Sequence, residues 1–441
     1  MILLYFIRSW WEYLFGTRKS SVVAWRSALS SFSFRIPRGR SSSLSEAFIW
    51  LRHSLALAIR SGSDSFTPTS EVLVVDDLAF KERGRVAYVS AILGTNCTFI
   101  GLDALRANSL IFKIRSLLYF SFLLIFLFPW VFLSSRRASF SLIIYDLIVL
   151  FLLDRSIARS SVRRIVWFGA FEKGSPLLID WFRRYRGIEV TIVPSTNPLR
   201  NFYRHVVADK VVLTAPFQQQ EVESGLAEGW VYKECVWWPP YGYERMLGVA
   251  GRSVQRGVIG FLSSGNWLRR ELGKDQLDPT WEQAEEVALR WCQTIVHSRQ
   301  DVALRVFLHP LEKRDPELLA RSLAHYEALG IPSTDIVSDR GGIAHPELMD
   351  VAVAVYSSAL FERLYAGYKG VFAQPGMAPG YFMNGSICNA IAHKEDEFQR
   401  LLGQALGQEE DAYFHSNGID AYRAEGHPSG GRSETYLGAK W

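Results

Sequence analysis

The sequence is poor in cysteine, and its four cysteines, Cys97, Cys235, Cys292 and Cys388, form no CxxC pair. Closely spaced cysteines are the usual signature of a structural zinc site, and disulfide-stabilised secreted domains carry cysteine at a much higher density. The sequence therefore predicts free thiols in a reducing compartment and no zinc site. It also lacks a DxD pair between a strand and a loop, so neither a bound metal nor another cofactor is predicted.

A signal-peptide pattern is missing as well. The first 15 residues are mostly apolar, but Arg8 and Glu12 lie inside the run and no small-residue cleavage site follows it. An interfacial helix fits this pattern better. Residues 1–60 hold nine Lys or Arg against two Glu, and the basic residues alternate with Trp, Phe and Leu. This composition favours an anionic membrane surface, not nucleic acid, as the partner.

Long apolar runs without a charge are rare in the chain, and the strongest membrane signal spans Leu117–Leu133. Its 17 residues are at the short limit for a membrane-spanning helix, and basic residues flank both ends. A second apolar run, Phe140–Leu153, is interrupted by Asp146. Residues 109–153 would form either a membrane-associated hairpin or one membrane helix followed by a buried strand. We favour an element that dips into one leaflet; a buried core helix and a spanning helix are the alternatives.

Strand-like and helix-like runs alternate in two series, from Val162 to about residue 237 and from Arg256 to about residue 405. This rhythm predicts an α/β fold with two Rossmann-like domains and parallel sheets. The expected regions are a basic, aromatic, amphipathic N-terminal segment (1–70), an N-terminal α/β domain that includes the apolar element (71–245), a C-terminal α/β domain (246–405) and a flexible tail (406–441).

Polar residues gather where the strands of the second series end. These ends fall at Ser263-Ser264-Gly265, His309-Pro310, Ser357-Ser358 and Gln374-Pro375. In open α/β sheets the carboxyl ends of the strands share an edge, and ligands bind there. Serine hydroxyls and helix-start N–H groups suit phosphate oxygens, and an imidazole can donate a hydrogen bond to them.

Each of these signals also has a structural interpretation. A serine pair before a helix is most often an N-cap, and a single histidine at a strand end is often structural. Glu362 lies one helical turn after Ser358, where it would hold a ribose hydroxyl or cap the helix. The order of the strand-end motifs carries more information than any one of them.

That order resembles the C-terminal donor domain of the two-domain Rossmann (GT-B) glycosyltransferases. Segment 256–375 looks most like the bacterial sialyltransferases and polysialyltransferases, with capsule polysaccharide and teichoic-acid polymerases next. Those families carry an HP dipeptide after one strand and a serine pair after a later strand. The resemblance implies that His309 binds or protonates the donor phosphate, that Ser357 and Ser358 hold phosphate oxygens, and that the two domains face each other across a cleft.

The catalytic base is less clearly marked. The same families place it in an acidic-acidic-Gly motif of the N-terminal domain, but here Asp76-Asp77 is followed by Leu78. Glu172 follows a predicted strand, so we rank it first as the base that deprotonates an acceptor hydroxyl, with Asp77 second. The alternative for each is a solvated loop acid.

The sequence thus predicts an inverting, metal-independent glycosyltransferase that uses a nucleotide sugar, with a CMP-sugar favoured. Its acceptor would be a surface glycan or a lipid-linked glycan at the cytoplasmic face of the inner membrane. Arg269, Arg270 and Lys313 would either replace a metal ion at the donor phosphates or be plain surface charges. One alternative is a polyol-phosphate transferase of the teichoic-acid polymerase type, in which His345 would be the second histidine. The other is a non-catalytic membrane assembly protein with a degenerate glycosyltransferase fold.

Overall fold

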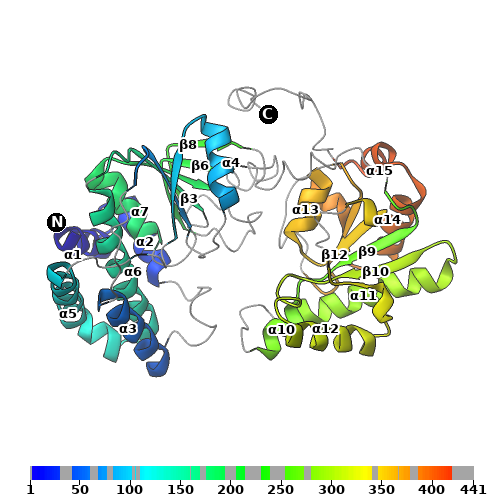
Figure 1. The fold of residues 1–441 in the computed structure, drawn as a ribbon, viewed down its shortest axis with the longest axis horizontal. Coiled ribbons are helices and arrows are strands. Elements are labelled where there is room, and N and C mark those ends of the chain that lie inside the picture. Colours follow the sequence, from blue (N-terminus) through cyan, green and yellow to red (C-terminus); the bar gives the residue numbers. More distant parts are fainter. Residues whose placement is uncertain are drawn as a thin grey trace. The chain divides into compact units, whose positions relative to one another are not determined.

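The computed structural model divides the chain into two compact units (Figure 1). Unit 1 holds the described residues up to Trp238, and unit 2 holds those from Val254 onward. The structure describes residues 2–29, 42–59, 68–76, 83–101, 105, 110–158, 160–168, 175–193, 205–213, 230–238, 254–272, 280–339, 346–365, 367–377 and 386–419.

In its described residues, unit 1 contains a parallel six-stranded sheet in the order β2-β1-β3-β4-β6-β8. Every residue of β1 is buried, and β3 and β4 bury all but their first residue. Such continuous Val- and Ile-rich burial is typical of strands covered on both faces. The strands are β1 (Val72–Asp76), β2 (Cys97–Gly101), β3 (Arg164–Phe168), β4 (Glu189–Val193), β6 (Lys210–Leu213) and β8 (Glu234–Trp237), with β5 (Val206–Val207) paired separately to β7 (Trp230–Val231).

Unit 1 contains a long helix, α6 (Arg137–Ile157), most of which is buried. The apolar helix α5 (Leu110–Leu133) and α3 (Leu44–Ile59) both pack against α6. The other helices are α1 (Ile2–Leu14), α2 (Lys19–Leu29), α4 (Arg83–Leu93), α7 (Ser175–Trp181) and the π-helix η2 (Phe182–Arg186). Asp154 near the end of α6 accepts hydrogen bonds from Trp181 Nε1 and Arg186 Nε, each at 2.7 Å.

Unit 2 contains a second parallel sheet, of six strands among the residues described, in the order β11-β10-β9-β12-β13-β14. The strands are β9 (Val258–Leu262), β10 (Ala303–Phe307), β11 (Ile336–Val337), β12 (Val351–Ala354), β13 (Gly370–Ala373) and β14 (Ile391–Ala392). The helices are α10 (Asn266–Glu271), α11 (Thr280–Ser298), α12 (Pro316–Ala328), α13 (Ser358–Tyr365), α14 (Glu395–Gly407) and α15 (Glu410–Ser416), with 3₁₀ turns η4 (Ser333–Asp335), η5 (Pro346–Leu348) and η6 (Ser386–Ala390).

The predicted α/β fold with parallel sheets is confirmed, and three details of the expectation need correction. The apolar run Phe140–Leu153 is a helix buried in the core of unit 1, not a strand, and it does not share the exposure of α5. The described residues between 2 and 59 pack into the core of unit 1 and do not form the separate N-terminal segment that was expected for residues 1–70. The predicted flexible tail begins with α15, because Tyr413 is buried there and donates a hydrogen bond to the Gly370 carbonyl at 2.9 Å.

Helix α1 is joined to unit 1 by a buried ion pair. Arg184 on η2 donates to both carboxylate oxygens of Glu12, at 2.8 and 2.9 Å, and to Asp180 at 3.0 Å. Tyr5 on α1 donates to the Leu177 carbonyl at 2.9 Å. Since a buried carboxylate needs a charged or hydrogen-bonded partner, Arg184 fixes the position of α1.

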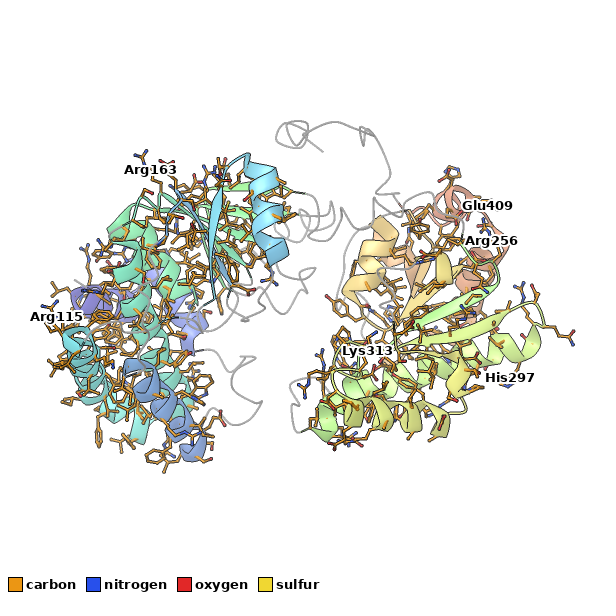
Figure 2. All side chains as sticks on the ribbon, viewed as in Figure 1. Arg115, Arg163, Arg256, His297, Lys313 and Glu409 are labelled. Atoms are coloured by element: carbon orange, nitrogen blue, oxygen red, sulfur yellow. The ribbon has the colours of Figure 1, made fainter. Side chains whose placement is uncertain are left out.

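We predict that Arg184→Met lowers the free energy of unfolding by about 3 kcal/mol, because it removes the buried cation that Glu12 and Asp180 share and leaves Glu12 with only the exposed Arg8. Urea denaturation followed by tryptophan fluorescence measures this. The control is Arg163→Met, which removes an exposed arginine that lies 4.0 Å from Glu71 (Figure 2). That variant is expected to unfold like the parent chain. Equal stability of the two variants would contradict the prediction.

Candidate functional site

The candidate site lies at the carboxyl ends of β9, β10 and β12, in the middle of the sheet of unit 2. From β9 the chain moves outward to β10 and β11, and then returns to the other side of β9 to form β12. This reversal of strand order makes the β9/β12 boundary a topological switch point, where α/β proteins bind ligands. Ser264 Oγ, after β9, donates to the carbonyl of Tyr356, after β12, at 3.0 Å. The two strand ends are therefore in direct contact.

Gly265 brings the loop after β9 against the loop after β10. Its φ of +62° lies in the left-handed region, and a Cβ at this position would lie 3.3 Å from His309 Cβ. Glycine meets both requirements, because it tolerates positive φ and has no side chain. The serine pair and the histidine thus meet at neighbouring strand ends.

The ring of His309 is held in one tautomer. Its Nδ1 accepts a hydrogen bond from the backbone N–H of Leu311 at 3.1 Å, so the proton of the neutral ring is on Nε2. Burial is the main cause that lowers the pKa of His309, and the charges of Arg269 and Lys313 add to it. Together they bring this pKa to about 4. His309 is therefore a neutral hydrogen-bond donor at neutral pH.

The guanidinium of Arg269 points at the same position. Its Nη2 lies 3.4 Å from His309 Nε2, and both nitrogens carry hydrogen. In the described part of the chain, no carboxylate forms an ion pair with Arg269. Two donors that converge in this way, one of them charged, suit an anionic acceptor that takes a hydrogen bond from each.

Beneath this donor pair lies the buried carboxylate of Glu312. It accepts hydrogen bonds from the His309 backbone N–H at 2.6 Å, from Trp267 Nε1 at 2.7 Å and from the Tyr326 hydroxyl at 3.1 Å. The Tyr326 hydroxyl also lies within hydrogen-bond distance of Ser263 Oγ, at 2.7 Å. Burial raises the pKa of Glu312 above its usual value. This one carboxylate fixes the loops after β9 and β10 and the start of α10.

A second buried carboxylate, Glu285 on α11, reaches the same loop. Its Oε1 accepts a hydrogen bond from the backbone N–H of Ser264, whereas Oε2 has no hydrogen-bond partner among the described residues. Burial raises the pKa of Glu285 to about 7, and the nearby charge of Glu312 contributes.

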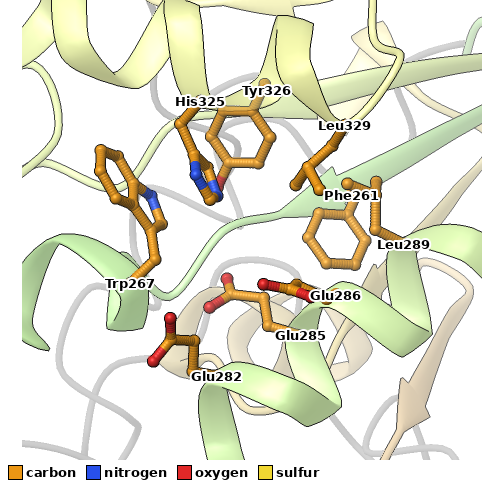
Figure 3. A pocket seen from close by; sticks show the side chains of 9 residues that line it. All are labelled: Phe261, Trp267, Glu282, Glu285, Glu286, Leu289, His325, Tyr326 and Leu329. Atoms are coloured by element: carbon orange, nitrogen blue, oxygen red, sulfur yellow. The ribbon is translucent and has the colours of Figure 1, made fainter.

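Glu285 faces a small pocket between α10, α11 and α12 (Figure 3). One side is acidic, and the other carries the indole of Trp267 stacked on the ring of His325, with ring centroids 4.1 Å apart. No group of three or more His, Cys, Asp or Glu side chains in the described residues is placed to hold a metal ion. The pocket is lined by Phe261, Trp267, Glu282, Glu285, Glu286, Leu289, His325, Tyr326 and Leu329.

The structure describes the side chains of only some of the other predicted donor-site residues. Ser357 Oγ accepts a hydrogen bond from the Ala359 N–H at 3.2 Å, so this serine caps α13. Pro310 is exposed beside His309. Ser358 and Glu362 are on α13, but their side chains lie outside the described set. Ser358 and Glu362 therefore stay predictions as ligand-binding residues.

Both candidate bases, Asp77 and Glu172, lie outside the described residues. The strands that precede them in the sequence, β1 and β3, are neighbours and end in register at Asp76 and Phe168. Asp76 itself is buried and paired with Arg85. Asp76 is thus a structural residue, and the roles of Asp77 and Glu172 stay predictions.

Sequence reasoning missed the polar residues beneath the site. Glu312 follows His309 by three positions, which is the spacing of one turn, but an isolated carboxylate in a helix-rich segment gave no sign of burial. Glu285, Trp267 and Tyr326 are distant in sequence from the strand-end motifs. Only the packing of α10, α11 and α12 brings them to the loop after β9.

No protein-family model matches the chain, and no curated protein matches its sequence. Solved structures that match include a variant of the O-GlcNAc transferase of Thermobaculum terrenum, with 14% identity, coverage of 92% of this chain and 74% of that chain, and a TM-score of 0.36. Another is a variant of the wall teichoic acid polymerase TagF soaked with CDPG, with 12% identity, coverage of 84% and 92%, and a TM-score of 0.37. At identities and TM-scores this low, neither likeness carries weight in assigning a function.

We predict that Gly265→Ala lowers the free energy of unfolding by about 1–2 kcal/mol through its positive φ and also displaces His309. Anion binding should therefore weaken together with stability, as measured by calorimetry with a nucleotide. The matched control is Gly187→Ala, at φ +63° with no atom within 4 Å of the added Cβ. It is expected to lose stability but keep anion binding. Unchanged binding in the Gly265 variant would contradict the placement of His309.

We also predict a pH-dependent effect of Glu285→Gln. The pKa of Glu285 is raised to about 7 in the folded state, so stability falls as the pH rises from the unfolded value of 4.5 through 7. Above pH 7 the ionised carboxylate destabilises the fold by about 3 kcal/mol, and below about pH 4.5 it has no effect. The variant should therefore be more stable than the parent at about pH 8 but not at about pH 4 in urea denaturation.

The control for this prediction is Glu286→Gln, which removes a partly exposed carboxylate that pairs with Arg290 on the same helix. It should show no comparable stabilisation at high pH. If Glu285→Gln were no more stable than the parent at about pH 8, the prediction that Glu285 is a buried, ionised carboxylate at that pH would be wrong.

Proposed function

We propose that unit 2 binds the phosphate groups of a nucleotide sugar and that the chain is a glycosyltransferase. The observation that carries the proposal is the convergence of His309 Nε2–H and the Arg269 guanidinium, 3.4 Å apart. A phosphate oxygen placed between them would accept one neutral and one charge-assisted hydrogen bond. The position at a topological switch point supports the same assignment.

The electrostatics of the site support a phosphate ligand in preference to a neutral sugar alone. Arg269 and Lys313 supply positive charge, and burial lowers the pKa of the Lys313 ammonium while the charges of Asp339 and Glu312 oppose that shift. Neutral His309 adds a donor with no further charge. Fixed cations of this kind would stabilise negative charge on a departing nucleotide, so the proposed transfer needs no metal ion.

The proposed reaction moves the sugar to a hydroxyl of a surface glycan or a lipid-linked glycan. A single displacement with one carboxylate base would invert the anomeric centre. Glu172 is the first candidate for that base and Asp77 the second, because each follows one of two neighbouring strands in unit 1. A CMP-sugar as the donor, and a place in capsule or other surface polysaccharide synthesis, follow only from the resemblance of the HP and serine-pair motifs to sialyltransferases.

We predict that CMP, CDP, UDP or GDP raises the unfolding temperature of the chain, with a cytidine nucleotide strongest. His309→Gln and Arg269→Met should each weaken that binding about tenfold or more in calorimetry, because each removes a phosphate contact. The matched control is His297→Gln, at an exposed histidine on α11 (Figure 2). It should bind like the parent chain. Failure of every nucleotide to bind would overturn the proposal.

Activity assays separate the remaining alternatives. Glu172→Gln should keep nucleotide binding and lose sugar transfer. Phosphodiester linkages in the product would instead identify a polyol-phosphate transferase, for which the candidate second histidine, His345, lies outside the described residues. Nucleotide binding without transfer, together with full complementation of a glycan defect by His309→Gln, would identify a non-catalytic protein.

A further inference from the structure

The exposed large apolar side chains that the structure describes gather in one part of the molecule. Among the described residues, all of them lie on α1 and the following Phe15, on α3 or on α5, and none lies in unit 2. The exposed fractions reach 70% for Leu4, 61% for Trp11, 75% for Ile125 and 78% for Leu133. Soluble surfaces carry scattered apolar residues, so a concentration on three helices indicates a binding surface.

The three helices form one continuous layer. Phe6 and Phe126 join α1 to α5, with ring centroids 5.5 Å apart. On the other side of α5, Phe48 on α3 lies 6.1 Å from Phe132. Helix α6 lies beneath α5, and α1, α3 and α5 are on the side of unit 1 away from α4 (Figure 1). We call this surface the α1–α5–α3 layer.

Helix α5 is apolar on the sides that face outward as well as on the side that faces the core. It is the one described helix long and apolar enough to cross a membrane, yet only 28% of its most apolar 18-residue window is buried. The buried residues form a stripe from Phe112 to Val131, along nearly the whole helix. Helix α5 is therefore packed against unit 1 along nearly its whole length, and its remaining sides are exposed.

The charges on the layer are of one sign. The exposed charged residues of α1, α3 and α5 are Arg8, Arg52 and Arg115, all basic, and Arg115 is visible at the outer side of α5 (Figure 2). The acids of these helices, Glu12 and Glu46, are buried. An apolar face with basic residues around it matches a leaflet of anionic phospholipid, where apolar side chains enter the acyl region and cations meet the headgroups.

We propose that the α1–α5–α3 layer binds in the plane of an anionic membrane and inserts its apolar side chains into one leaflet. This goes beyond the proposed sugar transfer and does not depend on it. The sequence analysis assigned residues 109–153, which include both α5 and α6, to the membrane-associated element. In the structure α6 lies in the core of unit 1, so the proposed membrane surface consists of α5 together with α1 and α3.

Co-sedimentation of the full chain with vesicles tests the proposal. The parent chain should pellet with vesicles of phosphatidylcholine mixed with phosphatidylglycerol, and less with phosphatidylcholine alone. Leu118→Asp, Ile125→Asp and Phe128→Asp combined should weaken binding at least about tenfold, because they place charge where acyl chains would be. Arg52→Gln with Arg115→Gln should weaken only binding to the anionic vesicles, about fivefold per residue.

The matched control is Thr294→Asp, Gln300→Asp and Gln399→Asp combined, which adds the same charge to exposed positions of unit 2. It should bind vesicles like the parent chain. Hydrogen exchange of the unaltered chain gives a second test, with vesicle-dependent protection expected in α5 and not in α11. Absence of vesicle binding, equal binding by the α5 variant, or a dimer in solution that the α5 variant dissociates would each overturn the proposal.

Discussion

The candidate site depends on the buried carboxylate of Glu312. Taking a carboxylate out of water is costly unless hydrogen bonds replace the lost hydration, and Glu312 receives them from the His309 N–H, Trp267 and Tyr326. These donors belong to the loop after β10, to α10 and to α12. The cost of leaving any one of them unpaired in the interior keeps all three elements in one arrangement, so the direction of the His309 ring follows from a requirement of the core.

The two units differ in how many large apolar side chains they expose. Unit 2 exposes no large apolar side chain among its described residues, and its buried charged groups include the Asp350–Lys369 ion pair, at 2.8 Å, as well as the carboxylates at the candidate site. Unit 1 satisfies its buried charges by ion pairs, such as Arg184 with Glu12 and Arg186 with Asp154, yet leaves an apolar layer on its outside. Exposing that apolar layer to water is unfavourable. We therefore expect a partner that is itself apolar to cover it.

The sequence predicted the parts of the fold that local patterns specify. Apolar strand-like runs predicted β1, β3, β4 and β6 of one sheet and β9 to β13 of the other, but not the strands β2, β8 and β14. Strand ends predicted that Ser263, Ser264 and His309 share an edge. It could not predict that Phe140–Leu153 forms a core helix, because an apolar run looks the same whether protein or lipid surrounds it. Nor could it predict Glu312 and Glu285, because their burial depends on how three helices pack over the loop after β9.

The charges beneath the site also limit how strongly it attracts a ligand. Arg269 and Lys313 carry the positive charge near His309. Burial lowers the pKa of the Arg269 guanidinium, and the nearby charges of Glu285 and Glu312 offset part of that effect. If both carboxylates were ionised, they would nearly cancel the two cations. Because burial raises the pKa of Glu285 to about 7, this carboxylate is partly protonated at neutral pH and opposes the two cations less than a fully ionised carboxylate would. A phosphate beside it would favour the protonated form further, so ligand charge and the protonation of Glu285 are linked.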